Sequence, residues 1–269
     1  MKIYLAALAL LLAQTAASRP TFEAASIKRN TSVSDGASFR GQTGRIAVTN
    51  NTLRNIIRNA WGLQGFQIVG GPDWINTERW DIVAKAEGNP QGPEMLAMVQ
   101  NLLADRFKLV THRETRDMPI YALVFAKADR AFGPNLHSSS TDCLKEMSAA
   151  VARGGGPPRD RVLCGTRAVN GRIEMNAVPM ANFARNLSPV AGRSVVDKTG
   201  LSGGFDAVLT WTPDASLGNS PEAPPPAPAT DGGPSLFTAI QEQLGLKLDA
   251  QRGPVEVLVI DSVERPVED

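Results

Sequence analysis

This chain of 269 residues contains few cysteines and histidines and has almost no net charge. It has two cysteines and two histidines, and 28 lysines and arginines stand against 27 aspartates and glutamates. No histidine cluster accompanies the cysteines to complete a zinc site. A nearly neutral chain without a basic run lacks the electrostatic surface that binds nucleic acid or anionic membranes. We therefore expect no metal, no cofactor and no nucleic acid among its ligands.

Catalytic signatures are also sparse. Lys198-Thr199-Gly200 resembles one triplet of penicillin-binding enzymes, but no Ser-x-x-Lys nucleophile accompanies it, which predicts a turn between strands. Only His112 and His137 could act as the base of a serine hydrolase, and we expect both at the surface. Asp73 and Asp81 stay open as an acid/base pair for sugar cleavage. The sequence therefore assigns no catalytic residue.

The N-terminal residues have the pattern of a secretory signal. Lys2 precedes an apolar run from Ile3 to Ala13 that is too short to span a bilayer, and Thr15-Ala16-Ala17 supplies small residues for cleavage. This predicts a signal peptide over residues 1–17, with an uncleaved anchor as the alternative. No later segment resembles a transmembrane helix. We expect a secreted or periplasmic protein.

The two cysteines, Cys143 and Cys164, are predicted to form a disulfide. A lone pair in an oxidising compartment most often means one such bond. Their spacing does not fit a Cys-x-x-Cys redox motif. The bond would close a loop of about twenty residues and stabilise the fold by about 3 kcal/mol in the chain-entropy model.

An internal repeat is the clearest organisational signal. Gly44-Arg45-Ile46 matches Gly171-Arg172-Ile173 at an offset of 127, and four further matches follow in the same order. These pair residues 53–60 with 180–187, 80–83 with 205–208, 108–113 with 247–252, and 119–124 with 254–259. The order of the matches predicts one folding unit written twice.

Hydrophobic periodicity predicts the order β-α-β-β-α-β, with an extra strand, in each half. In the first half, Asn51 or Thr52 should cap a helix that ends at Gly62, and Pro93 should open a second helix. In the second half, helices are expected from Pro179 to Gly192 and over 235–244. The fold class is therefore α+β, a split-βαβ or ferredoxin-like layer whose helices pack on a mostly antiparallel sheet.

The chain divides by composition as well as by repeat. The first α+β repeat is expected over 18–130 and the second over 169–269. A loop or insert over 131–168 contains both cysteines, and a proline-rich loop over 213–234 interrupts the second repeat. Residues 22–28 read as an additional strand that could extend one sheet.

Tryptophans are the best candidates for ligand contact. Trp61, Trp74 and Trp80 lie around the turn that holds Asp73, and Trp211 lies at the end of a predicted strand. Aromatic rings beside polar groups suit sugar stacking and protein contacts. Core packing is the alternative for Trp61 and Trp80, which fall on apolar faces, so Trp74 is the first residue to test.

Several longer strings carry a family resemblance. They are GGPDW at 70–74, DIVAKA at 81–86, LADRFKL at 103–109, HRET at 112–115, VDKTGL at 196–201 and GPVEVLVID at 253–261. The chain resembles the soil-associated secreted protein family of acidobacteria, which contains a domain of unknown function. It is also similar to a domain fused to antirepressor-type M56 membrane metallopeptidase sensors. The resemblance implies export and this architecture, and no activity.

The function predicted from these observations is a non-catalytic extracytoplasmic binding or sensory module, with an unidentified ligand or protein partner. Small duplicated α+β units commonly offer a groove or an open sheet edge for a partner. A secreted hydrolase that acts on glycan or peptide is one alternative, and a structural envelope protein is another.

Overall fold

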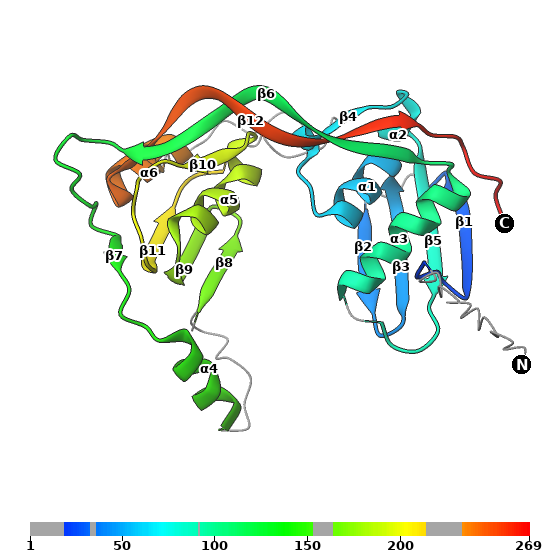
Figure 1. Cartoon of the computed structure of the whole chain (residues 1–269), viewed down its shortest axis with the longest axis horizontal. Helices are drawn as coiled ribbons and strands as arrows, with labels where there is room; N and C mark the ends of the chain where they lie inside the picture. The colour runs from blue at the N-terminus through cyan, green and yellow to red at the C-terminus, as the bar shows by residue number, and fades with distance from the viewer. Residues whose placement is uncertain (1–18, 33–35, 91, 153–163, 214–232) are drawn as a thin grey trace, which may run out of the picture. The chain divides into compact units, whose positions relative to one another are not determined.

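A computed structural model describes residues 19–32, 36–90, 92–152, 164–213 and 233–269. Within these ranges the chain forms six α-helices and three four-stranded sheets, in which most strand pairs are antiparallel (Figure 1). The predicted α+β class is confirmed. The predicted signal peptide and nearly all of the proline-rich loop lie outside the described residues. No helix within these ranges combines the length and the apolar character that a membrane crossing requires.

The chain forms two compact units. Unit 1 comprises residues up to His112 together with Val259–Asp269, and unit 2 comprises Arg113–Leu258. One sheet, of order β10-β6-β12-β4, includes two long strands that supply residues to both units: β6 (Val110–Phe125) and β12 (Leu246–Ser262). The boundaries of the compact units therefore differ from those of the predicted repeats. Unit 1 includes Val259–Asp269, which belong to the second repeat in the sequence.

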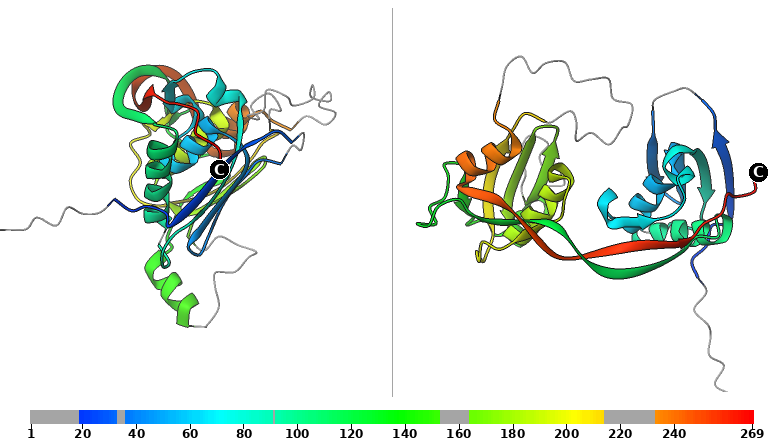
Figure 2. Two further views of the ribbon diagram at one scale, coloured as in Figure 1. Left: turned by 90° about the vertical axis from the view of Figure 1, so that its right-hand side faces the viewer. Right: turned by 90° about the horizontal axis from the view of Figure 1, so that it is seen from above.

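Unit 1 contains a sheet of order β1-β5-β3-β2, all antiparallel. Its strands are β1 (Ala24–Asn30), β2 (Ser38–Gln42), β3 (Arg45–Thr52) and β5 (Arg79–Lys85), and β4 (Ile68–Gly70) lies in the sheet of long strands. Helices α1 (Leu53–Trp61) and α3 (Gly92–Arg106) contact each other. Alternate strand residues such as Ile46, Val48 and Ile82 are buried, so the helices cover one face of this sheet (Figure 2).

Local sequence explains where α1 begins and ends. The Thr52 hydroxyl accepts a hydrogen bond from the Asn55 amide, which satisfies one of the free amides of the first turn. Gly62 follows the last turn in the left-handed conformation, with φ of 63°. A short 3-10 turn, η1 (Gly65–Gln67), and a one-turn helix, α2 (Trp74–Thr77), lie on either side of β4.

Unit 2 contains a second sheet, of order β7-β11-β9-β8 and also antiparallel. Its strands are β7 (Leu136–Ser138), β8 (Gly165–Val169), β9 (Arg172–Val178) and β11 (Phe205–Thr210), and β10 (Val195–Asp197) pairs in parallel with β6. Helices α5 (Met180–Ala191) and α6 (Leu236–Leu244) bury their apolar faces in one core centred on Phe183, Leu187 and Ile240.

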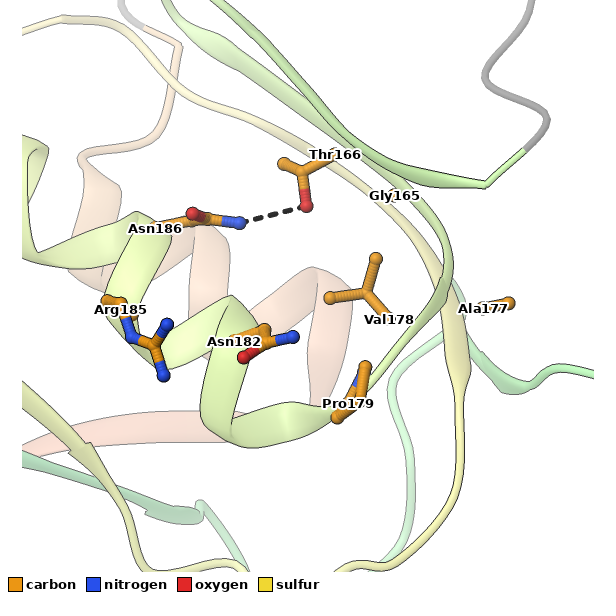
Figure 3. A pocket seen from close by; sticks show the side chains of 8 residues that line it. All are labelled: Gly165, Thr166, Ala177, Val178, Pro179, Asn182, Arg185 and Asn186. Atoms are coloured by element: carbon orange, nitrogen blue, oxygen red, sulfur yellow. Dashed lines mark hydrogen bonds between the residues drawn. The ribbon is translucent and has the colours of Figure 1, made fainter. Parts of the chain in front are cut away.

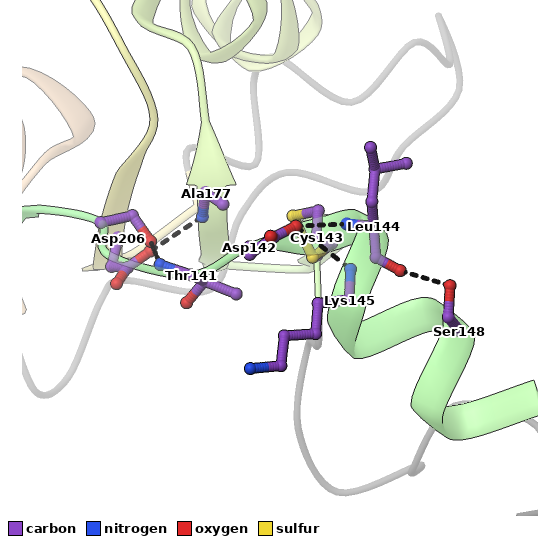
Figure 4. The surroundings of a disulfide bond; sticks show 10 residues. Thr141, Asp142, Cys143, Leu144, Lys145, Ser148, Ala177 and Asp206 are labelled. Carbon is purple, nitrogen blue, oxygen red and sulfur yellow. Dashed lines mark hydrogen bonds between the residues drawn. A yellow bond between two sulfur atoms is a disulfide. The ribbon is translucent and has the colours of Figure 1, made fainter. Parts of the chain in front are cut away.

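The region predicted as a loop or insert over 131–168 contains regular structure. It includes β7, helix α4 (Cys143–Ala152) and the start of β8. The predicted disulfide is confirmed: it joins Cys143 to Cys164, with their Cα atoms 5.8 Å apart (Figure 4). Asp142 caps α4 by accepting hydrogen bonds from the amides of Leu144 and Lys145, both at 3.1 Å. The disulfide therefore ties the first residue of α4 to the residue before β8.

The two units share one distinctive backbone feature. Asn50 and Ala177 both have positive φ, 50° and 54°, at a register shift near the end of β3 or β9. The amide of each donates to an aspartate of the neighbouring strand, Asn50 to Asp81 at 2.7 Å and Ala177 to Asp206 at 2.8 Å. These positions match in the predicted repeat. The duplication itself is not confirmed and stays a prediction that superposition of 45–127 on 172–263 would test.

Candidate functional site

The tryptophans proposed from sequence lie in different environments. Trp80 and Trp211 are buried, at 2% and 8% exposure, whereas Trp61 and Trp74 are partly buried. Trp80 packs edge-on against Trp74 and against Phe107, with ring centroids 6.5 Å and 5.3 Å apart. In unit 1 the rings therefore form part of the packing around Trp80.

Trp74 offers less free surface than its position in a turn suggested. The Arg265 guanidinium lies 5.0 Å from the centroid of its ring, a cation–π distance. Arg265 also donates to both carboxylate oxygens of Glu78, at 2.7–3.1 Å. These hydrogen bonds, more than the nearby charge of Arg29, lower the pKa of the Glu78 carboxyl. These contacts of Arg265 fasten the segment Val259–Asp269 to the rest of unit 1.

The carboxylates proposed as an acid/base pair differ in their contacts. Asp73 is exposed at the start of α2. Asp81 accepts hydrogen bonds from the Asn30 side chain at 2.9 Å and 3.0 Å, and from the Asn50 amide. Asp81 is therefore engaged in holding β1 and the end of β3 against β5.

Residues 198–204 contain two patterns associated with hydrolases, and both form a connection between strands. The Lys198-Thr199-Gly200 turn is held by Asp197, whose carboxylate accepts from the Thr199 amide and hydroxyl at 2.9 Å and 2.7 Å. Gly200 to Gly204 also fits Gly-x-Ser-x-Gly, with Ser202 at its centre. In hydrolases that pattern joins a strand to a helix, whereas here it leads from β10 into β11.

The two histidines do not complete such a site. His112 lies 2.9 Å from a carboxylate oxygen of Asp261, on β6 and β12 in unit 1. His137 lies on β7 and is exposed. Across the part of the chain that the structure describes, no hydrogen bond joins Ser202 to a histidine, and no group of three His, Cys, Asp or Glu side chains could hold a metal ion.

A pocket of about 390 Å³ lies in unit 2, where the start of β8 and the end of β9 meet helix α5 (Figure 3). Eight residues line it: Gly165, Thr166, Ala177, Val178, Pro179, Asn182, Arg185 and Asn186. Asn182, Arg185 and Pro179 are exposed, so the pocket is open to solvent. No acidic residue is among the eight.

The backbone at the start of α5 positions this pocket. The Asp206 carboxylate holds the left-handed conformation of Ala177, and Pro179 follows as the N-cap of α5 with extended backbone. This abrupt change from strand to helix places Val178 and Pro179 on one wall. The spacing of Asn182, Arg185 and Asn186 puts all three on one face of α5, as Figure 3 shows.

The polar groups of the pocket are only partly satisfied within the protein. The Asn186 side-chain NH₂ donates to the Thr166 hydroxyl oxygen at 2.8 Å, which connects α5 to β8. Among the described residues, Arg185 forms no hydrogen bond and no ion pair, and the Asn182 side chain forms no hydrogen bond. The pocket therefore presents a free guanidinium beside two carboxamides and a hydroxyl.

A protein-family model described as "Protein of unknown function (DUF3738)" matches residues 54–263. The chain belongs to the DUF3738 family. No curated protein and no solved structure matches it. The DUF3738 match includes all eight residues that line the pocket of unit 2.

Sequence reasoning missed this pocket, although the repeat contains a signal for it. The pattern Asn-x-x-Arg-Asn occurs at Asn182, Arg185 and Asn186 on α5, and again at 55–59 on α1. The offset is 127, the same as in the predicted duplication. Apolar matches follow from packing a common core, but a matched set of polar residues outside that core does not. Comparing the polar positions of the halves would therefore have identified these residues of the DUF3738 chain.

Proposed function

We propose that this protein is a non-catalytic extracytoplasmic binding module that holds a small anionic ligand in the pocket of unit 2. The observation that carries the proposal is the unpaired Arg185 guanidinium in a pocket that no carboxylate lines. A guanidinium offers donors in a planar fork, which matches the two oxygens of a carboxylate or of a phosphate. The positive charge of Arg185 has no partner among the described residues, and a bound anion would provide that partner.

The remaining lining suits a small molecule. Its volume of about 390 Å³ lies at the lower end of typical ligand pockets. The carboxamides of Asn182 and Asn186 each offer a donor and an acceptor, and Val178 and Pro179 supply an apolar wall. This combination of a few polar groups with apolar contact is typical of pockets that bind small molecules.

Three observations favour a location outside the cytoplasm. The first residues have the pattern of a signal peptide, and the Cys143–Cys164 disulfide suits an oxidising compartment. The resemblance to the soil-associated secreted family points the same way. The similarity to a domain fused to M56 sensors suggests that binding serves detection of a ligand, by analogy. A secreted hydrolase or a structural envelope protein has no comparable support in the described contacts.

Replacement of Arg185 tests the proposal. Arg185→Gln should weaken binding at least about tenfold, because a charge-assisted hydrogen bond contributes roughly 1.5–3 kcal/mol. Isothermal titration of the purified mature chain with acetate, glucuronate, phosphate and sulfate would measure this. Arg193→Gln is the matched control. It removes the same charge just beyond α5, where Arg193 lies 5.1 Å from the Tyr121 ring centroid.

The two variants separate a specific site from general electrostatic attraction. Equal losses in Arg185→Gln and Arg193→Gln would mean that only net charge matters. If wild-type protein binds none of the anions, or if Arg185→Gln binds as tightly as wild type, the pocket of unit 2 is not the site and the proposal is wrong. Circular dichroism of both variants would show that the fold is retained.

A further inference from the structure

The hydrogen bond between Asn186 and Thr166 determines which polar groups remain for a ligand. The Asn186 NH₂ donates to the Thr166 hydroxyl oxygen at 2.8 Å. The side-chain oxygen of Asn186 is left as an acceptor, and the Thr166 hydroxyl can still donate its own proton. Together with the Asn182 carboxamide, the pocket therefore offers both donors and acceptors beside the guanidinium of Arg185.

The balance of charge limits the anion to a single negative charge. Arg185 is the only charged residue among the eight that line the pocket. One guanidinium balances one carboxylate, whereas a phosphate group carries about −1.5 to −2 at neutral pH and usually needs further cations. A monocarboxylate therefore fits the pocket better than a phosphate ester.

The same inventory disfavours a ligand that carries an amine. An ammonium group needs acceptors and usually a carboxylate when it is bound. The Asp206 carboxylate contacts the lining, but it is already engaged there, because it accepts a hydrogen bond from the Ala177 amide at 2.8 Å. The ammonium group of an amino acid or amino sugar would therefore lie near the positive charge of Arg185, with no carboxylate in the lining to balance it.

Hydroxyl groups fit the remaining donors and acceptors. A hydroxyl both donates and accepts, so it can pair with the Asn186 oxygen, the Thr166 hydroxyl or either atom of the Asn182 carboxamide. An unsubstituted fatty acid would leave these groups without partners once it displaced their water, which is unfavourable.

We propose that the ligand class of this pocket is a hydroxylated monocarboxylate, such as a sugar acid. The inference rests on the proposed function, because it names the ligand of the same site. The carboxylate pairs with Arg185, the hydroxyl groups with Asn182, Asn186 and Thr166, and the carbon skeleton contacts Val178 and Pro179.

A set of matched small molecules tests this ligand class on the purified mature chain. Glucuronate, glucose, glucosamine and glucose 6-phosphate share one ring and differ in charge, gluconate is an open-chain acid, and hexanoate is a carboxylate without hydroxyls. Titration calorimetry should show that glucuronate or gluconate binds at least about tenfold more tightly than glucose, glucosamine and hexanoate. Arg185→Gln should remove that preference.

A second variant tests the role of the hydroxyl donors. Thr166→Val keeps the branched shape and removes the hydroxyl, so affinity for the sugar acid should fall roughly fivefold while that for hexanoate stays unchanged. Thr210→Val makes the same chemical change on β11, where the backbone of Thr210 bonds Gln243, and should leave binding unchanged. A fall for both ligands in Thr166→Val would indicate that Thr166 only supports the pocket wall.

The outcomes distinguish this inference from the function on which it rests. Binding that depends on Arg185 but is as tight for hexanoate or glucose 6-phosphate as for the sugar acids would overturn the ligand class and leave the anion-binding function intact. Equally tight binding of glucosamine would refute both. Absence of binding by every compound in the set would refute both.

Discussion

Removal of the Cys143–Cys164 disulfide should lower the stability of unit 2 by an amount that follows from the loop it closes. The two cysteines are 21 positions apart. In the chain-entropy model, cross-linking a loop of this length stabilises the folded state by about 3 kcal/mol. At roughly 2–4 °C per kcal/mol for a chain of this size, the double variant Cys143→Ser/Cys164→Ser should melt about 6–12 °C lower than the oxidised protein.

Thermal unfolding followed by circular dichroism, with and without reductant, measures the effect. Reductant should lower the melting temperature of wild-type protein to that of the double variant, and should not change the variant itself. The folded spectrum at 25 °C should be retained, because the core of unit 2 around Phe183 and Leu187 does not include either cysteine.

Local exchange provides a second measure of the same perturbation. Cys164 directly precedes Gly165 and Thr166, which line the pocket of unit 2. Amide hydrogen exchange over 165–169 should therefore accelerate on reduction more than exchange over β3 in unit 1. A melting temperature that changes by less than about 1 °C, with equal exchange in β8, would refute the loop-closure reasoning.

Two further perturbations test the packing of unit 1. Hydrogen bonds from Arg265 and Arg106 lower the pKa of Glu78 and of Asp269, respectively, so their stabilisation is present above about pH 4 and is lost as the pH falls through the lowered values. Acidification well below about pH 4 should release Arg265 from the ring of Trp74, measured as the fluorescence difference between wild type and Trp74→Phe. A difference that is constant across the acid titration would contradict this. Trp80 is 2% exposed and its indole N–H has no hydrogen-bond partner among the described residues. Trp80→Ala should lose about 3–5 kcal/mol in urea unfolding. Trp80→Phe keeps a ring in the core and gives up no hydrogen bond, so it should lose less, and a loss as large as that of Trp80→Ala would contradict this reasoning.

Helices were predicted well because their signals are local. Gly62 and Gly192 end α1 and α5 in the left-handed conformation, as predicted, and Gly245 ends α6 in the same way. The buried residues of α3 recur with the period of an amphipathic helix: Met95, Met98, Val99, Leu102 and Leu103. These features depend on residues three to four positions apart, which a single sequence shows directly.

Strand continuity was predicted less well. The predicted repeat treats 108–113 and 119–124 as separate segments, and 247–252 and 254–259 likewise, yet β6 and β12 run continuously through Pro119 and Pro254. Proline lacks the amide that a ladder on both sides requires, so it is tolerated where one side is unpaired. On β6 the pairing with β10 covers only Tyr121 to Leu123, so Pro119 lies beyond it. Such pairing is a long-range property that the local pattern does not contain.

The pocket could not be predicted from local patterns for the same reason. It forms because β8, at the end of a region read as a loop or insert, approaches the face of α5 that contains Arg185. In the sequence Arg185 is one more surface cation. Its significance depends on the absence of a nearby carboxylate in space, which only the fold determines.

The assignment of Val259–Asp269 to unit 1 has a consequence for the order of folding. A ribosome or a translocation channel delivers the chain from its N-terminus, so unit 2, which is continuous, can close before unit 1 receives its last segment. Until that segment arrives, the backbone carbonyls of Phe107 and Ile27 in unit 1 lack their hydrogen-bond donors, the amides of Glu264 and Asp269. A stop codon placed just after Leu258 would therefore damage the half of the protein that was synthesised first.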